Sequence, residues 1–291
     1  MQRNDPCAPF DVLHPPALCS GVVFASPHSG TCYDTAFLKQ SSLDPHTIRS
    51  SEDAYVDVLF QSAVTQGCAF LVAHTPRAYV DLNRAADELD PALITGVKRH
   101  GVNPRVIAGL GVIPRVVAAG RAIYRGKLSL HEAHHRLNTH WRPYHAKLQN
   151  ILDQAHATFG QTLLIDCHSM PHEAINPNDM PRDHMPEIVL GDRFGAAAGR
   201  TLVDRIEAAF HRAGFRVARN APFAGAYIAQ QYGRPSRGQH VVQVEIDRSL
   251  YMDEISLAPL PEFAHFQNRL QPVISDIANL IRAQDYPMAA E

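Results

Sequence analysis

The sequence lacks the features that mark membrane, secreted and nucleic-acid-binding proteins. No apolar run approaches the roughly 18 residues that a membrane-spanning helix needs. The N-terminal stretch Met-Gln-Arg-Asn-Asp-Pro-Cys has no apolar core of the kind found in signal peptides. The formal net charge is only −2, which argues against a general nucleic-acid or membrane binder. We therefore expect a soluble protein of the cytoplasm.

Cysteine is also scarce, with five residues in a chain of 291. Their number is odd, they are scattered, and none forms a Cys-x-x-Cys pair, which favours reduced thiols over a disulfide scaffold. They are Cys7, Cys19, Cys32, Cys68 and Cys167. Histidine, in contrast, occurs 17 times. That abundance raises the expectation of a metal or proton-transfer site.

The sequence contains no repeat, low-complexity tract or long linker, so we predict one domain over residues 1–291. Short apolar runs predict strands at residues 21–26, 69–73, 78–82, 162–167, 215–218 and 241–246. Helices are predicted at residues 52–66, 128–159 (kinked or split at Pro143), 194–213 and 263–283. Residues 88–119 are expected to form an excursion outside the core, and residues 170–185 and 225–238 to form loops. This alternation predicts a three-layer α/β sandwich.

Polar clusters stand at the ends of these apolar runs. Three of them are Pro27-His28-Ser29-Gly30, Asp81-Leu82-Asn83-Arg84 and Asp166-Cys167-His168-Ser169, and Glu245 lies inside Val-Val-Gln-Val-Glu-Ile. Open α/β sheets bind their ligands at the carboxyl ends of the strands. Histidines, carboxylates and arginines gathered there predict a metal-assisted hydrolase site.

His28 and His168 are the candidate metal ligands, because neutral imidazoles bind zinc well. The period of two along a strand places Asp166 on the same side as His168. Asp166 could then accept the second N–H of a ligating histidine. The alternatives are a turn histidine at position 28 and a structural His–Asp pair at 166 and 168.

Carboxylates supply the candidates for a third ligand and a base. Asp53 and Asp57 lie four residues apart at the predicted start of a helix, where they would share a face. Such residues also complement the helix dipole, and only the histidines elsewhere favour Asp53 as a ligand. Glu245 lies in an otherwise apolar strand, which is costly unless it is paired or functional. It could act as a base, or form an ion pair with Arg248 or Arg237.

Two arginines, Arg77 and Arg84, could reach the same cleft. Guanidinium groups bind carboxylates through two parallel hydrogen bonds, so either could hold an acidic substrate. The alternative is a pair of structural salt bridges with Asp81 or Asp87.

A competing motif is His131-Glu132-Ala133-His134-His135, which matches the His-Glu-x-x-His pattern of zinc metalloproteases. His140 and His145 lie nearby, and no third ligand follows at a metzincin-like spacing. We interpret the segment mainly as a solvated helix face.

Taken together, the blocks resemble the N-formylglutamate amidohydrolases over most of the chain. The match includes Ser26-Pro27-His28-Ser29-Gly30, Glu52-Asp53 with Asp57, Pro76 to Arg84, Asp166-Cys167-His168-Ser169, Gly225-Ala226-Tyr227, Tyr232-Gly233-Arg234-Pro235 and Gln243-Val244-Glu245-Ile246. The Asp-Leu-Asn-Arg block also looks like that of aspartoacylase, a relative in the zinc carboxypeptidase-like superfamily.

This resemblance implies a zinc carboxypeptidase-like (phosphorylase/hydrolase-like) fold with a mixed, twisted sheet and one catalytic Zn²⁺ or another divalent ion. It also implies roles for individual residues. His28, His168 and Asp53 would be metal ligands, with Glu52 open as the alternative carboxylate. The position three beyond His28 is Thr31, so the superfamily's compact His-x-x-Glu pair is absent.

The other implied roles concern the substrate. Glu245 would be the general base, Arg77 would stabilise the oxyanion, and Asn83 and Arg84 would grip the substrate carboxylate. The expected substrate is a small N-acyl amino acid with a free carboxylate, above all N-formyl-L-glutamate, which would yield formate and L-glutamate. No nucleic-acid or membrane partner is expected. A non-catalytic carboxylate-binding module of the same fold is the further alternative.

Overall fold

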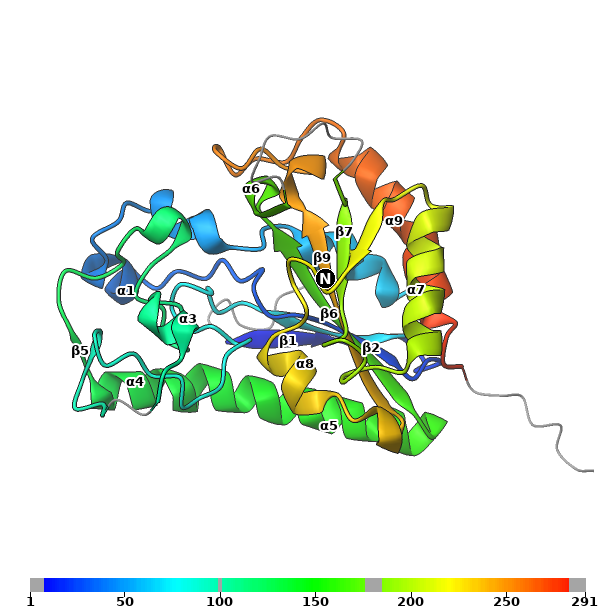
Figure 1. The fold of residues 1–291 in the computed structure, drawn as a ribbon, viewed down its shortest axis with the longest axis horizontal. Helices are drawn as coiled ribbons and strands as arrows, with labels where there is room; N and C mark the ends of the chain where they lie inside the picture. Colours follow the sequence, from blue (N-terminus) through cyan, green and yellow to red (C-terminus); the bar gives the residue numbers. More distant parts are fainter. Residues whose placement is uncertain (1–7, 99–100, 176–184, 283–291) are drawn as a thin grey trace, which may run out of the picture.

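A computed structural model describes residues 8–98, 101–175 and 185–282. Seven of its strands form one sheet in the order β1-β3-β2-β6-β9-β7-β8 (Figure 1). Their bounds are β1 Phe10–Leu13, β2 Val22–Ser26, β3 Ala69–Ala73, β6 Thr162–Met170, β7 Ile188–Gly191, β8 Val217–Arg219 and β9 Gln239–Asp247. A separate short pair joins β4 Ile94–Thr95 to β5 Leu128–Ser129.

The sheet is mixed, as the resemblance implies. Strands β3, β2, β6 and β9 run parallel to one another, whereas β1 and β7 pair antiparallel with β3 and β9. Strand β8 is parallel to β7. The carboxyl ends of the four parallel strands therefore meet at one edge of the sheet. Strand β6 is the middle strand of the seven.

Helices cover both faces of the sheet, which gives three layers. Helices α2, α7 and α9 pack on one face, and α4, α5 and α8 pack on the other. Figure 1 shows α5 along one side and α7 with α9 on the opposite side. The helix bounds are α1 Thr35–Gln40, α2 Val56–Phe60, α3 Pro104–Ile107, α4 Leu130–Arg136, α5 Arg142–Phe159, α6 His172–Ile175, α7 Arg200–Arg212, α8 Tyr227–Tyr232 and α9 Phe263–Ala278.

Alternation along β6 assigns its side chains to the two faces. Leu163, Ile165 and Cys167 pack in the core under α2 and α9, whereas Leu164 packs toward α5. Asp166 and His168 continue the Leu164 series, so the period of two places them on the α5 side, beyond the end of the apolar core there.

The predicted strands at 21–26, 69–73, 162–167 and 241–246 are confirmed as β2, β3, β6 and β9. Strand β6 continues to Met170, so that His168 lies within the strand. The strand predicted at 215–218 is shifted to β8, and β1 and β7 were not predicted.

The strand predicted at 78–82 is wrong. The backbone N–H groups of Tyr79 and Val80 both donate to the carbonyl of Pro76, at 2.9 and 3.2 Å, and form a turn. Val80 and Leu82 are buried against the α5 side of the core without belonging to the sheet. Their apolar character thus reflects burial in a loop.

The helix predicted at 52–66 begins later than expected. Tyr55 has a φ of 65°, in the left-handed region, and α2 begins only at Val56. Asp53 therefore precedes the helix, and the shared helix face predicted for Asp53 and Asp57 is wrong. This leaves Asp53 on an extended connection that follows a 3₁₀ turn, Thr47–Ser51.

Other segments differ in detail. Residues 88–119 contribute Leu93, Ile94, Val112 and Ile113 to the core, so they are more than an excursion. A π-helical turn, Leu137–Trp141, divides α4 from α5 just ahead of Pro143, which confirms the predicted split.

The remaining boundaries also differ from the prediction. The predicted loop at 225–238 contains α8, α7 begins at Arg200, and α9 ends at Ala278. In 170–185, the structure describes the end of β6 and α6, and residues 176–184 lie outside the described part. No helix in the described ranges is both long and apolar enough to cross a bilayer.

Candidate active site

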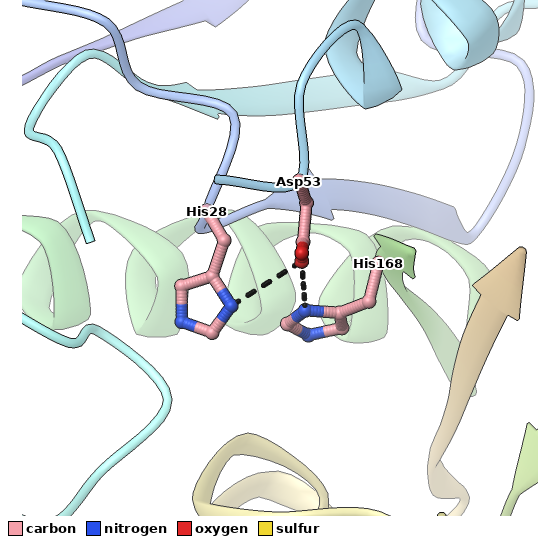
Figure 2. A group of neighbouring side chains, drawn as sticks. All are labelled: His28, Asp53 and His168. Atoms are coloured by element: carbon pink, nitrogen blue, oxygen red, sulfur yellow. Dashed lines mark hydrogen bonds and ion pairs between the residues drawn. The ribbon is translucent and has the colours of Figure 1, made fainter. Parts of the chain in front are cut away.

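Three buried side chains meet at the carboxyl edge of the parallel strands. They are His28, Asp53 and His168, whose potential ligand atoms all lie within 4.8 Å of one another. Figure 2 shows both imidazole rings directed at the Asp53 carboxylate. The Nδ1 atoms of His28 and His168 lie 3.4 and 2.9 Å from the same oxygen, Oδ2 of Asp53. His168 lies more than a hundred positions from both other residues in the chain, so distant segments converge on one point.

Local structure explains how His28 reaches this position. His28 follows β2 in a tight turn, and its carbonyl accepts a hydrogen bond from the Asp53 N–H at 3.0 Å. Gly30 passes so close to the next segment that a Cβ there would overlap the carbonyl oxygen of Thr75. The glycine therefore allows the chain to turn closely behind His28.

A second carboxylate lies beside Nε2 of each histidine. The Nε2 atom of His28 lies 2.8 Å from Asp81 Oδ1, and Nε2 of His168 lies 3.0 Å from Asp166 Oδ1. Carboxylates in this position fix the tautomer of a metal-ligating histidine and increase its basicity. For His28 this leaves the Nδ1 lone pair on the side of Asp53, whereas Nε2 of His168 also lies 3.1 Å from Nδ2 of Asn83.

This arrangement fits a divalent cation. Nδ1 of His28 is buried and makes no hydrogen bond, so a donor atom is left facing the cluster. Two imidazole nitrogens and one carboxylate oxygen form a typical three-ligand set of a catalytic zinc site. The buried group of His28, Asp53 and His168 could therefore bind a metal.

Asp53 is fixed by Arg248, which donates from Nη2 to Oδ1 at 2.8 Å. Burial alone would raise the pKa of Asp53, but the contacts with His168 and His28 and the charge of Arg248 hold it well below its usual range. Glu52, the alternative ligand, instead forms an ion pair with Arg49 at 3.1 Å and lies outside the cluster.

Glu245 lies next to the cluster on β9. Its side chain accepts a hydrogen bond from Gln243 Nε2 at 2.6 Å, and it is buried. Burial raises the pKa of Glu245 to about 7, although the charge of nearby His168 acts in the opposite direction. A carboxyl group with a pKa near neutrality is suited to accept and return a proton.

Asn83 links the cluster to α8. Its amide donates to Asp166 Oδ2 at 3.3 Å, and its carbonyl oxygen accepts from the N–H of Ile228 at 2.8 Å. Both ends of the Asn83 side chain thus already have partners within the protein. The predicted contact of Asn83 with a substrate stays a prediction.

The two predicted arginines differ in their surroundings. Arg77 donates from Nε to Asp81 Oδ2 at 3.1 Å and is partly exposed. Arg84 is only 7% exposed and donates to two backbone carbonyls, those of Leu110 and Asn83. In the described part of the chain, Arg84 has no ion pair with a carboxylate.

A cavity of about 620 Å³ joins these groups. Its lining includes His28, Asp53, His168, Glu245, Arg77 and Arg84, together with Asn83. The structure therefore brings these seven predicted site residues together around one cavity. Gln243 donates a hydrogen bond to Glu245, and Arg248 donates one to Asp53. The sequence pattern assigned neither of them a role in the site. Gln243 shares the strand alternation with Glu245, and Arg248 follows directly after β9, as the other clusters follow their strands.

The competing His-Glu-x-x-His motif lies elsewhere, on α4. His131 and His135 are exposed, and Glu132 forms an ion pair with Arg136 at 2.9 Å. Among the described residues, this motif is part of no cluster of three potential ligands. The geometry agrees with a solvated helix face.

Comparison with known proteins identifies the family. The family model for N-formylglutamate amidohydrolase matches residues 20–252. The chain belongs to this family. The resemblance seen in the sequence blocks is thereby confirmed, and the chain is a hydrolase that acts on an amide bond.

Individual relatives agree with this assignment. The N-formylglutamate deformylase of Pseudomonas aeruginosa is 29% identical over 265 residues, which cover 90% of this chain and 92% of the relative. The deformylase of Pseudomonas putida is 27% identical over 90% of this chain and 91% of its own length. The structure of N-formylglutamate amidohydrolase from Ralstonia eutropha JMP134 has a TM-score of 0.87 at 34% identity, covering 94% of this chain and 98% of that one. A gene product of Agrobacterium tumefaciens shares the fold, with a TM-score of 0.64 at 14% identity over 94% and 96% of the two chains.

Proposed function

We propose that this family member hydrolyses N-formyl-L-glutamate to formate and L-glutamate with the help of a divalent cation, and that the cation is zinc. One observation carries the proposal. Nδ1 of His28 and Nδ1 of His168 converge on one oxygen of Asp53, while a carboxylate oxygen lies 2.8 or 3.0 Å from each Nε2. The names of the relatives, which are deformylases of N-formylglutamate, supply the substrate.

The residues of the chain divide the chemistry among them. His28, Asp53 and His168 would hold the cation, which when bound polarises the acyl carbonyl and lowers the pKa of a nearby water. Glu245 accepts the proton of the attacking water and returns it to the departing amine, which the raised pKa of this group favours. Arg77 stabilises the negative charge that develops on the acyl oxygen.

Arg84 binds the substrate carboxylate in this proposal. A guanidinium that is buried without a carboxylate partner is costly, and a substrate carboxylate would supply the missing partner. Binding at this point orients the formyl group toward the His28 and Asp53 side of the cavity. Asn83 helps to fix the position of Arg84, because it immediately precedes Arg84 in the chain and its side chain donates a hydrogen bond to Asp166.

The decisive test is release of formate from N-formyl-L-glutamate by the purified protein. The assay is repeated after chelation and after separate additions of zinc, cobalt, iron and manganese. Loss of activity on chelation and its return with zinc would support the proposal. Full activity in the chelated, metal-free protein would refute the role of the cation, and no formate release under any condition would refute the substrate.

We further infer that the sheet is of the zinc carboxypeptidase-like type and that the chain is one catalytic domain acting in the cytoplasm. The four parallel strands with the cluster at their carboxyl edge support the first of these proposals. The buried Glu245 beside the cluster favours catalysis over a binding module, since a module that only holds a carboxylate needs no base. The metalloprotease alternative gains no support from the exposed His131 and His135.

A further inference from the structure

Four arginines line the active-site cavity: Arg77, Arg84, Arg105 and Arg248. Two of them are paired with carboxylates, because Arg77 lies 3.1 Å from Asp81 and Arg248 lies 2.8 Å from Asp53. Within the described ranges, neither Arg84 nor Arg105 forms an ion pair. The cavity therefore has two positive charges that the protein itself does not neutralise through a direct contact.

These two arginines are connected through a short loop. Arg84 donates from Nε to the carbonyl of Leu110 at 3.1 Å, and the N–H of Leu110 donates to the carbonyl of Arg105 at 2.8 Å. Burial lowers the pKa of Arg84, and the positive charge of Arg105 contributes to that lowering. The charge of Arg105 thus acts on the Arg84 guanidinium across one wall of the cavity.

The backbone of Arg105 is held by a hydrogen bond even though its side chain is exposed. It lies on the short helix α3, where the side chain of Asn103 accepts the N–H of Arg105 at 3.0 Å. The amide of Asn103 in turn donates to Glu88 Oε2 at 3.1 Å, which ties α3 to the segment after Arg84. The Arg105 backbone is therefore fixed at the cavity, and its side chain is free to meet a ligand.

We propose that Arg105 determines substrate specificity by binding the side-chain carboxylate of an acidic N-acyl amino acid, while Arg84 binds the α-carboxylate. This inference rests on the proposed function. The α-carboxylate is attached to the carbon beside the scissile nitrogen, so it must bind close to the cluster. Arg84 is buried there, directly after Asn83, which contacts Asp166. The side-chain carboxylate extends farther from the reacting bond, and Arg105 is an exposed residue of the cavity lining, whereas the cluster is buried.

The test compares two substrates that differ only in the charge of the side chain, N-formyl-L-glutamate and N-formyl-L-glutamine. In Arg105→Gln we expect kcat/KM for the glutamate substrate to fall about 10- to 100-fold, mainly through KM, because one charged hydrogen-bonding partner is lost. The glutamine substrate should be little affected by this change. Arg84→Gln should weaken both substrates to a similar degree, since both have an α-carboxylate.

Two further variants serve as controls. Arg105→Lys keeps the charge and should recover part of the preference for glutamate. Arg125→Gln changes an exposed arginine that does not line the cavity, and it should leave both substrates unchanged.

Equal losses on the two substrates in Arg105→Gln, or unchanged kinetics, would overturn the role of Arg105 and leave the deformylase proposal intact. Release of no formate by the wild-type protein from either substrate would instead refute the proposed function itself, and the specificity role would fall with it.

Discussion

Glu245 lies directly beside His168, because the two are partners in the parallel register of β9 and β6. The same alternation turns Gln243 and Asp166, two residues earlier on each strand, toward the same side. A proton acceptor is thereby placed next to a candidate metal ligand by strand pairing alone. Its position is thus set by the pairing of two central strands of the sheet.

Replacing Glu245 tests proton transfer separately from metal binding. In Glu245→Gln we expect turnover of N-formylglutamate to fall by about 10²- to 10⁴-fold, because the amide cannot accept the proton. The metal content should stay the same, since Glu245 is not part of the ligand cluster. Formate release and elemental analysis measure the two effects. Glu262→Gln, on an exposed surface residue, is the control; turnover retained in Glu245→Gln would remove the proposed base.

The two candidate histidine motifs are distinguished by metal content. We expect His168→Ala to lose the bound metal, because it removes one of the two Nδ1 atoms that face Asp53. His131→Ala should keep it, since His131 is exposed on α4. Elemental analysis of the purified variants, with circular dichroism to verify folding, decides the matter. The reverse pattern would point to the His-Glu-x-x-His motif.

The carboxylate behind His28 should tune the affinity for the cation. In Asp81→Asn we expect the affinity to fall by about 10- to 100-fold, because the Nε2 proton of His28 loses its carboxylate partner. Competition with a chromophoric chelator measures the change. Asp276→Asn, which alters an exposed ion pair with Arg212, is the matched control. An affinity equal to that of the wild type would show that Asp81 does not act through the histidine.

His145 should make the stability of the fold depend on pH. Burial lowers its pKa from 6.5 to about 4. Its Nε2–H donates to the carbonyl of Leu82, and its Nδ1 accepts from the hydroxyl of Tyr232. The folded protein therefore favours the neutral imidazole. The resulting stability is fully present above pH 6.5 and is lost as the pH falls toward 4.

This loss should amount to about 3 kcal/mol in the free energy of unfolding, since each unit of pKa shift corresponds to about 1.4 kcal/mol. Urea unfolding of the wild type and of His145→Gln at several pH values measures it. We expect the variant to be less stable at pH 7 and to lose less stability on acidification. Parallel pH curves for the two proteins would contradict the assignment.

Much of the site could be predicted from local patterns. Apolar runs located β2, β3, β6 and β9, and the polar residues at their ends named His28, His168 and Glu245 as candidates. The period of two also joined Asp166 to His168. These predictions succeed because strand alternation and the position of a strand's end are properties of short stretches of sequence.

Other features depend on contacts between distant segments. Nothing near Asp53 in the sequence distinguishes it from Glu52, and the left-handed backbone of Tyr55 that delays α2 carries no glycine signal. The turn at 78–82 looks like a strand because its apolar residues are buried in the core. Whether this segment forms a strand or a turn depends on the segments that pack against it.

The sequence by itself determined where the central strands lie and which imidazoles stand at their ends, because these follow from periodicity within a few residues. Only the tertiary structure decided that Asp53 lies between the two imidazoles, that Asp81 lies beside Nε2 of His28, and that Arg105 lines the cavity. Those relationships arise from the packing of segments far apart in the chain, which no local pattern encodes.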